Sequence, residues 1–184
     1  MKKIFFLLIA VWLFLSVQAQ EGRQLTKAET VNYLEKKFKE TEGLKRRLRL
    51  PIASYSEDKA KRSCPIDDFV IALTGCTATI SFTNNCSNYT FNSKGYTYKF
   101  DPKDIRKIEI YNDSSFVASS PIESLKIYFN GSSVRYTCSD CDTRAIEVMT
   151  LPYFKGDGKN FDKIRKAFFH LSSLCKAEDD PFGN

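Results

Sequence analysis

Histidine, tryptophan and methionine are scarce in this chain of 184 residues, which has one histidine, one tryptophan and two methionines. The lone histidine, His170, excludes a metal site built on two histidines, and it would have to serve alone in any Ser-His-Asp or Cys-His arrangement. No Gly-x-Ser-x-Gly segment is present to hold a nucleophilic serine. Because His170 borders the apolar stripe of a predicted helix, we expect it to have a structural role.

Loops that hold phosphates or calcium are also absent. The eight glycines never form a glycine-rich phosphate loop. The segment Asp157-Gly158-Lys159-Asn160 does not repeat acidic ligands at alternate positions, as a calcium loop does. The sequence therefore predicts no cofactor and no metal site.

The chain has a single long apolar run, and it lies at the N-terminus. Lys2 and Lys3 precede an almost wholly apolar stretch over 4–17, and small residues at Val17 and Ala19 are typical of a signal-peptidase site. The run is shorter than the roughly 18 residues that a membrane-spanning helix needs. We expect residues 1–19 to be a cleaved signal peptide and the product to be periplasmic or extracellular. No cysteine lies near the cleavage site, so a lipid anchor is not expected.

The net charge of +6 is unevenly distributed, with the basic excess in residues 20–62. Residues 44–50 form a basic segment before Pro51, which we expect to be a short strand or a helical turn. Four side chains in this segment are candidates for contact with anionic lipid headgroups or envelope polysaccharide: Lys45, Arg46, Arg47 and Arg49. The alternative is a solvated basic face.

Periodicity predicts one helix at each end of the mature chain. Thr26 and Glu29 form a capping box, and apolar residues follow at helical spacing until Gly43. These are Val31, Leu34 and Phe38. A second amphipathic helix is predicted from about Phe161 to Lys176, with Asn160 as its N-cap. Its apolar side consists of Phe161, Ile164, Ala167, Phe168, Leu171, Leu174 and Cys175.

Between the helices, residues 66–154 alternate apolar and polar side chains in short runs, which predicts six to eight antiparallel strands. The alternating sets are Phe69, Ile71, Leu73; Ala78, Ile80, Phe82; Tyr96, Tyr98, Phe100; and Ile108, Ile110. Asn130-Gly131 favours a type I′ hairpin over Leu125–Cys138, with Leu125 and Ile127 facing Tyr136 and Val134. A last strand is expected over Ala145–Leu151, ending at Pro152.

These elements predict an α+β domain in which the helices pack on a small antiparallel barrel or sandwich. We expect three sequence regions: the signal peptide over 1–19, the N-terminal helix and basic segment over 20–62, and the β domain with its C-terminal helix over 63–184. The length of the mature chain, 20–184, is that of one folded unit.

The element order over about residues 66–176 resembles that of a pleckstrin-homology-like barrel. That family usually has a tryptophan in its last helix, whereas the only tryptophan here is Trp12 in the signal peptide. Its phosphoinositide binders carry Lys and Arg around the first hairpin, and residues 63–93 contain neither. Lipid-headgroup binding is therefore not carried over. The stretch Lys-Ala-Phe-Phe-His-Leu in the final helix also resembles the C-termini of short exported bacterial proteins, which implies no function.

Six cysteines lie in the predicted mature chain, and an oxidising compartment favours three disulfides among them. They are Cys64, Cys76, Cys86, Cys138, Cys141 and Cys175. Six cysteines allow 15 pairings, and sequence does not choose among them. Our working assignment joins Cys138 to Cys141, Cys76 to Cys86, and Cys64 to Cys175, with a buried free thiol as the alternative for Cys175.

The Cys138-Ser139-Asp140-Cys141 segment has the spacing of a redox motif, in which a lowered thiol pKa permits disulfide exchange. Its predicted position at a strand end and its aspartate both disfavour a thiolate. A zinc site would need a second pair of ligands that the chain lacks.

Two pairs of acids could serve glycoside hydrolysis, although surface turns also collect acids for solvation. They are Asp67 with Asp68, and Asp140 with Asp142. Since no complete catalytic arrangement is visible, we expect a non-catalytic binding or structural module of the bacterial envelope. Its partner would be a protein, a glycan or an anionic surface, and nucleic acid is not expected. The alternatives are a small ligand carrier or a hydrolase of envelope glycans, and a thiol-disulfide redox protein.

Overall fold

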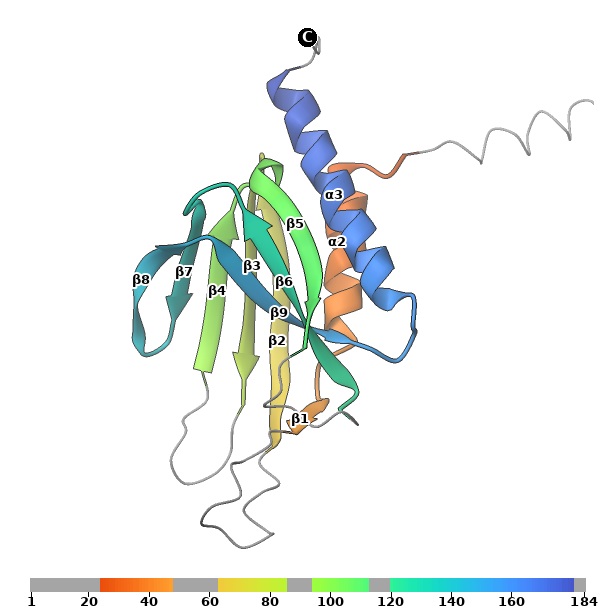
Figure 1. Cartoon of the computed structure of the whole chain (residues 1–184), viewed down its shortest axis with the longest axis vertical. Helices are drawn as coiled ribbons and strands as arrows, with labels where there is room; N and C mark the ends of the chain where they lie inside the picture. The colour runs from red at the N-terminus through yellow and green to blue at the C-terminus, as the bar shows by residue number, and fades with distance from the viewer. Residues whose placement is uncertain (1–23, 48–62, 86–93, 113–119, 181–184) are drawn as a thin grey trace, which may run out of the picture.

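The computed structural model describes residues 24–47, 63–85, 94–112 and 120–180 (Figure 1). The predicted signal peptide, Arg49 and Cys86 lie outside these described residues. The helical elements are α2 (Lys27–Lys39), η2 (Pro102–Asp104) and α3 (Asn160–Asp179). The strands are β1 (Lys45–Arg47), β2 (Ser63–Thr74), β3 (Thr77–Asn84), β4 (Lys94–Phe100), β5 (Ile105–Tyr111), β6 (Ile122–Phe129), β7 (Val134–Cys138), β8 (Cys141–Ile146) and β9 (Val148–Phe154). The predicted α+β class is confirmed.

The strands form two antiparallel sheets and not a closed barrel. Six strands follow the order β1-β2-β3-β4-β7-β8, and three follow β5-β6-β9. The inner faces of the sheets meet, for example where the rings of Phe100 and Phe129 pack edge to face at 5.2 Å. The two helices lie side by side at one flank of the sheets, with α2 against β2 and β9 and α3 against η2 and β5 (Figure 1).

Helix α2 begins where the sequence predicts. Both halves of the capping box form, because the Thr26 side chain accepts a hydrogen bond from Glu29 N while the Glu29 carboxylate accepts one from Thr26 N. The predicted apolar stripe is buried, and the Phe38 ring stacks on Phe69 of β2 at 4.8 Å. Truncating a buried phenylalanine such as Phe38 to alanine costs about 3–5 kcal/mol.

Alternation along β3 and β4 separates a buried inner face from a polar outer face. Ala78, Ile80 and Phe82 of β3 are buried, as are Tyr98 and Phe100 of β4. This matches the predicted strand pattern. In β5, Ile108 is buried but Ile110 is 42 % exposed, so only the first of those two predicted residues contributes to the core.

The predicted hairpin over Leu125–Cys138 is wrong. β6 pairs with β5 and β9, and β7 pairs with β4 and β8, so the two segments belong to different sheets. A type I′ turn needs positive φ at both central residues. Gly131 has φ +63°, but Asn130 is not among the described residues with positive φ. The Asn130-Gly131 segment therefore carries the chain from one sheet to the other.

The predicted last strand, Ala145–Leu151, is also wrong as a single element. β8 ends at Ile146 and β9 begins at Val148, so the chain passes between the sheets at Glu147. Here Phe129 N donates to Glu147 O at 2.9 Å, which ties this crossing to the end of β6. Pro152 lies inside β9 and does not end it; β9 is an edge strand, where a missing N–H is tolerated.

Helix α3 is slightly longer than predicted and begins differently. Lys159, not Asn160, occupies the N-cap position and makes no side-chain capping bond. Asn160 is fully buried as the first helical residue, and its Nδ2 donates to Phe154 O at 2.6 Å. Along the predicted apolar side, five residues are buried: Ile164, Ala167, Phe168, Leu171 and Cys175.

The described part of the basic segment forms a strand and not a helical turn. Residues Lys45–Arg47 form β1, an edge strand paired with Ser63–Pro65 of β2. Neither helix in the described ranges is long and apolar enough to cross a membrane.

Candidate functional site

The outer face of the six-stranded sheet is open to solvent in the part of the chain that the structure describes. Both helices lie on the inner side, where Phe38 stacks on Phe69 and Phe69 stacks on Phe82. Six hydroxyl side chains, none of them fully buried, occupy outward positions of β3, β4 and β7: Thr77, Thr79, Ser81, Thr83, Thr97 and Thr137. Together with Lys99 and Arg135 they form what we call the outer hydroxyl face.

Strand register arranges this face in two rows that cross the strands. In one row, Thr79 lies opposite Lys99, and Lys99 lies opposite Arg135. In the next row, Ser81 lies opposite Thr97, and Thr97 lies opposite Thr137. Neighbouring strands are about 4.8 Å apart, so each row offers closely spaced polar groups. A ligand on this face would meet cations in one row and hydroxyls in the other.

Lys99 and Arg135 are the unusual pair on this face. Like charges placed directly opposite each other on neighbouring strands destabilise a sheet. Both side chains are exposed, and neither has an ion pair or side-chain hydrogen bond within the described ranges. An anion held between the two would relieve their repulsion and accept hydrogen bonds from both.

Two adjoining hollows flank this pair, and Ser133 and Arg135 line both. The hollow of about 260 Å³ is lined by Thr77, Lys99, Phe100, Asp101, Ser133 and Arg135. The hollow of about 370 Å³ is lined by Ser132, Ser133, Arg135, Thr143, Arg144 and Ala145. Their linings are mostly hydroxyl and cationic, which suits a polar, negatively charged ligand better than an apolar one.

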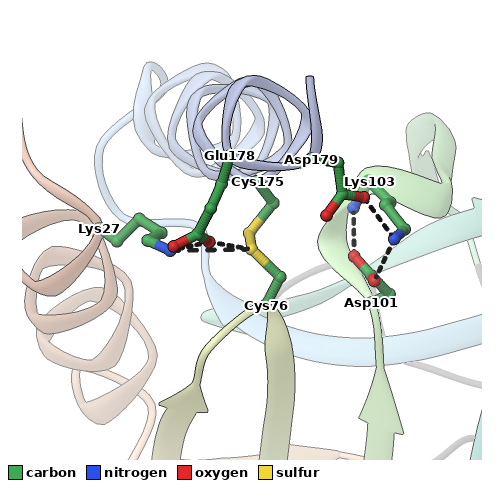
Figure 2. A network of polar contacts seen from close by, with 7 residues as sticks. All are labelled: Lys27, Cys76, Asp101, Lys103, Cys175, Glu178 and Asp179. Atoms are coloured by element: carbon green, nitrogen blue, oxygen red, sulfur yellow. Dashed lines mark hydrogen bonds and ion pairs between the residues drawn. A yellow bond between two sulfur atoms is a disulfide. The ribbon is translucent and has the colours of Figure 1, made fainter. Parts of the chain in front are cut away.

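The acid beside the cations, Asp101, already has a lysine partner. Lys103 Nζ lies 3.2 Å from Asp101 Oδ2 and 2.6 Å from Asp179 Oδ2 at the end of α3 (Figure 2). Hydrogen bonds to Asp179 and then to Asp101 raise the pKa of Lys103 above its usual value, so the lysine stays charged. Asp101 shares Lys103 with Asp179, and among the described residues no ion pair joins it to Lys99 or Arg135.

The same end of α3 is held by a disulfide. Cys175, fully buried in α3, is bonded to Cys76, which lies in the turn between β2 and β3 (Figure 2). Beside it Lys27 of α2 forms an ion pair with Glu178 of α3, and Glu178 Oε2 lies 3.1 Å from Cys76 Sγ. These contacts fix α3 against both the β2–β3 turn and η2, and so hold Thr77, the first residue of β3, and Asp101, the N-cap of η2.

The cysteine assignment is right in one pair and wrong in two. Cys138 and Cys141 form a disulfide, as expected. Cys76 pairs with Cys175, which overturns both Cys76–Cys86 and Cys64–Cys175, as well as the free thiol at Cys175. The reason is that the β2–β3 turn, which carries Cys76, lies against α3, while Cys64 lies at the other end of β2.

The Cys138–Cys141 disulfide closes the end of the β7–β8 hairpin, where the two cysteines are cross-strand partners. The motif is not at a helix N-terminus, the position that lowers thiol pKa in redox enzymes. Asp140 lies between the cysteines in sequence and pairs with Lys94 at 3.7 Å. This geometry is that of a structural bridge.

His170 has a structural partner. Its Nε2 lies 2.7 Å from Leu25 O, which ties α3 to the residue just before the N-cap of α2. Among the described residues, no Ser or Cys side chain is hydrogen-bonded to its imidazole, whose contact is to a backbone carbonyl.

The other predicted candidates are separated from the outer hydroxyl face. Asp67 accepts a hydrogen bond from Asn85 Nδ2 at 3.3 Å, and Asp68 sits in the β2 bulge with φ +57°. Neither these acids nor Asp140 and Asp142 line the two hollows. In the basic segment, Lys45, Arg46 and Arg47 lie on the edge strand β1, on the far side of the sheet order from β7 and β8, while Arg49 lies outside the described residues.

Comparison with known proteins identifies no family for this chain. No family model, curated protein or solved structure matches the chain. Within the described ranges, no three His, Cys, Asp or Glu side chains gather in a group that could hold a metal ion.

Sequence reasoning missed Lys99 and Arg135. The two are far apart along the chain, and each appears in the sequence as an ordinary polar residue of an alternating strand. Only the pairing of β4 with β7 brings them together, and the sequence pattern had assigned β7 to β6 instead.

Proposed function

We propose that the protein is an exported, non-catalytic binding module of the bacterial envelope that uses its outer hydroxyl face to bind an anionic partner. Export is supported by the predicted signal peptide, and the two described disulfides fit an oxidising compartment. The binding role is supported by the site: it offers cations and hydroxyls on a rigid sheet.

One observation carries the proposal. Lys99 and Arg135 face each other across β4 and β7 without a counter-ion among the described residues, and both line one hollow. Arginine presents a planar fork of donors that matches carboxylate, phosphate and sulfate groups, and lysine adds a point charge. A fold gains no stability from such a pair, so a ligand that neutralises it accounts for the pair best.

This arrangement supports binding more than catalysis. The hollows contain cations and hydroxyls, and their one acid, Asp101, is held by Lys103. A glycan hydrolase needs two carboxyl groups across its substrate, one of which stays protonated. A carrier of an apolar ligand needs an enclosed pocket lined mostly by apolar side chains.

The experiment is a binding titration with two polymers that differ in charge. The mature chain, residues 20–184, is produced in an oxidising compartment and titrated with dextran sulfate and with uncharged dextran. We expect binding to dextran sulfate that weakens as salt rises, because exposed charges are screened. The variant K99E/R135E is expected to bind at least about tenfold more weakly, equivalent to about 1.4 kcal/mol.

A matched control keeps the net charge of that variant. Lys36 on α2 and Lys166 on α3 are exposed and have no described ion pair, so K36E/K166E changes the total charge equally on the helices, which lie on the inner side of the sheet. Equal losses in both variants would show that only net charge matters. Unchanged binding by K99E/R135E would refute the proposed site.

A further inference from the structure

The outer hydroxyl face is suited to one class of anionic partner. We infer that the partner is an acidic polysaccharide, a chain of hydroxyl-bearing sugars with carboxylate groups, which lies across β3, β4 and β7. This inference rests on the proposed function of the same face, and it adds what the two rows recognise.

The hydroxyls of this face are available to a ligand. Thr79, Ser81 and Thr97 make no side-chain hydrogen bond to the part of the chain that the structure describes. Thr137 shares one hydrogen bond of 2.9 Å with Thr143, which leaves further donor and acceptor capacity on each hydroxyl. The face therefore holds a row of unused hydroxyls parallel to its cations.

Hydroxyl groups both donate and accept hydrogen bonds. Sugar hydroxyls do the same, so a polysaccharide can pair with Ser81 and Thr97 in either direction. Its carboxylates would lie in the neighbouring row, between Lys99 and Arg135, with the guanidinium donating two parallel hydrogen bonds. The two rows thus match the two kinds of group on an acidic sugar chain.

A lipid surface fits this face less well. Membrane-surface binding uses clusters of several cations, each contributing about 1 kcal/mol, together with apolar side chains that enter the lipid. The central rows carry two cations, and their nearest exposed large apolar side chain is Val70 of β2, at 47 % exposure. Neither the charge nor the apolar surface is large enough.

A protein partner also fits less well. The residues that dominate protein interfaces are tryptophan, tyrosine and arginine, while serine and threonine are under-represented among them. The aromatic side chains of β3 and β4 point the other way: Phe82 and Tyr98 are buried between the sheets. Arg135 is the one residue of the outer hydroxyl face that belongs to the types that dominate protein interfaces.

The experiment compares two polymers of similar carboxylate density that differ in hydroxyl content. Polygalacturonate carries hydroxyls and carboxylates, whereas poly-L-glutamate carries carboxylates alone. The mature wild-type chain is expected to bind polygalacturonate at least about tenfold more tightly, per carboxylate, than poly-L-glutamate. Vesicles of phosphatidylglycerol and phosphatidylcholine supply the membrane comparison.

Variants then separate hydroxyl recognition from charge. T79V/T97V removes two hydroxyls with side chains of the same shape, and valine is well tolerated in strands. We expect it to lose the preference for polygalacturonate while its affinity for poly-L-glutamate stays within about twofold of wild type. T79S/T97S keeps the hydroxyls and is expected to keep the preference. Thermal unfolding of each variant shows that the fold is retained.

Two results would overturn the inference. The first is equal affinity of the wild type for the two polymers, with the same affinities in T79V/T97V. This result would show that the hydroxyls do not contribute to recognition. Tighter binding to the anionic vesicles than to polygalacturonate would indicate a membrane surface instead. In either case, a loss of binding in K99E/R135E would still support the proposed anion site. Failure of the polysaccharide inference can therefore be distinguished from failure of the proposed function.

Discussion

Cys76 and Cys175 join the turn between β2 and β3 to α3 across 99 residues of sequence. Because the bridge closes a long loop, removing it should increase the entropy of the unfolded chain considerably. We predict that C76S/C175S lowers the free energy of unfolding by about 2–4 kcal/mol, measured by urea denaturation. A loss below about 0.5 kcal/mol would contradict this role for the bridge.

The Cys138–Cys141 bridge closes a short hairpin turn, and we predict that it has no redox activity. The mature protein should not catalyse thiol-dependent reduction of insulin above the uncatalysed rate, because the motif is not at a helix N-terminus and an aspartate lies between its cysteines. A catalysed rate that disappears in C138S/C141S would revive the redox alternative.

The remaining two cysteines should form a third bridge. The register of β2 with β3 places Ile66 opposite Asn84, and Asn85 N donates to Pro65 O at 2.8 Å. The described ladder ends there, one residue short of Cys64 and of Cys86. We predict no free thiols on mass-tagging the denatured protein, and a peptide containing Cys64 linked to Cys86 after digestion. Two tagged thiols at these positions would contradict the prediction.

Helix α2 and the buried faces of β3 and β4 could be predicted because their signals are local. A capping box and a stripe at i, i+3 and i+7 depend only on neighbours in sequence. Strand pairing depends on distant segments, and the Asn130-Gly131 turn signal was compatible with a hairpin that the fold does not make. The real partners of β6 are β5 and β9, which pair with it along both of its edges.

The candidate site could not be predicted from the sequence for the same reason. The predicted anionic-contact residues formed a visible run, Lys45 to Arg49. In contrast, Lys99 and Arg135 become neighbours only through the β4–β7 ladder. The cysteine pairs across long separations depend in the same way on where α3 packs.

Acid should weaken the contact between β6 and the end of β9. Partial burial works to raise the pKa of Glu123, but hydrogen bonds from Lys155 and Tyr153 outweigh it and hold the pKa below its usual value. The charged carboxylate therefore stabilises the fold above the unfolded-state pKa of about 4.3, and this contribution is lost as pH falls through the lower folded-state pKa.

The variant E123Q tests this directly. At pH 7 it should be less stable than wild type by about 1 kcal/mol, since Tyr153 and Lys155 lose a charged acceptor. The difference should shrink as pH falls below about 4, where the wild-type carboxyl also becomes neutral. A difference that is constant from pH 7 to pH 3 would contradict the assignment.

The central claim is that anionic polymers contact the outer hydroxyl face, and lysine footprinting tests it most directly. The mature chain is acetylated briefly with and without polygalacturonate, and the modification of each lysine is measured by mass spectrometry. Lys99 should be protected at least about threefold at saturating polymer, while Lys36 on α2 and Lys166 on α3 should react as before. Unprotected Lys99, or equal protection of all three lysines, would contradict binding at this face.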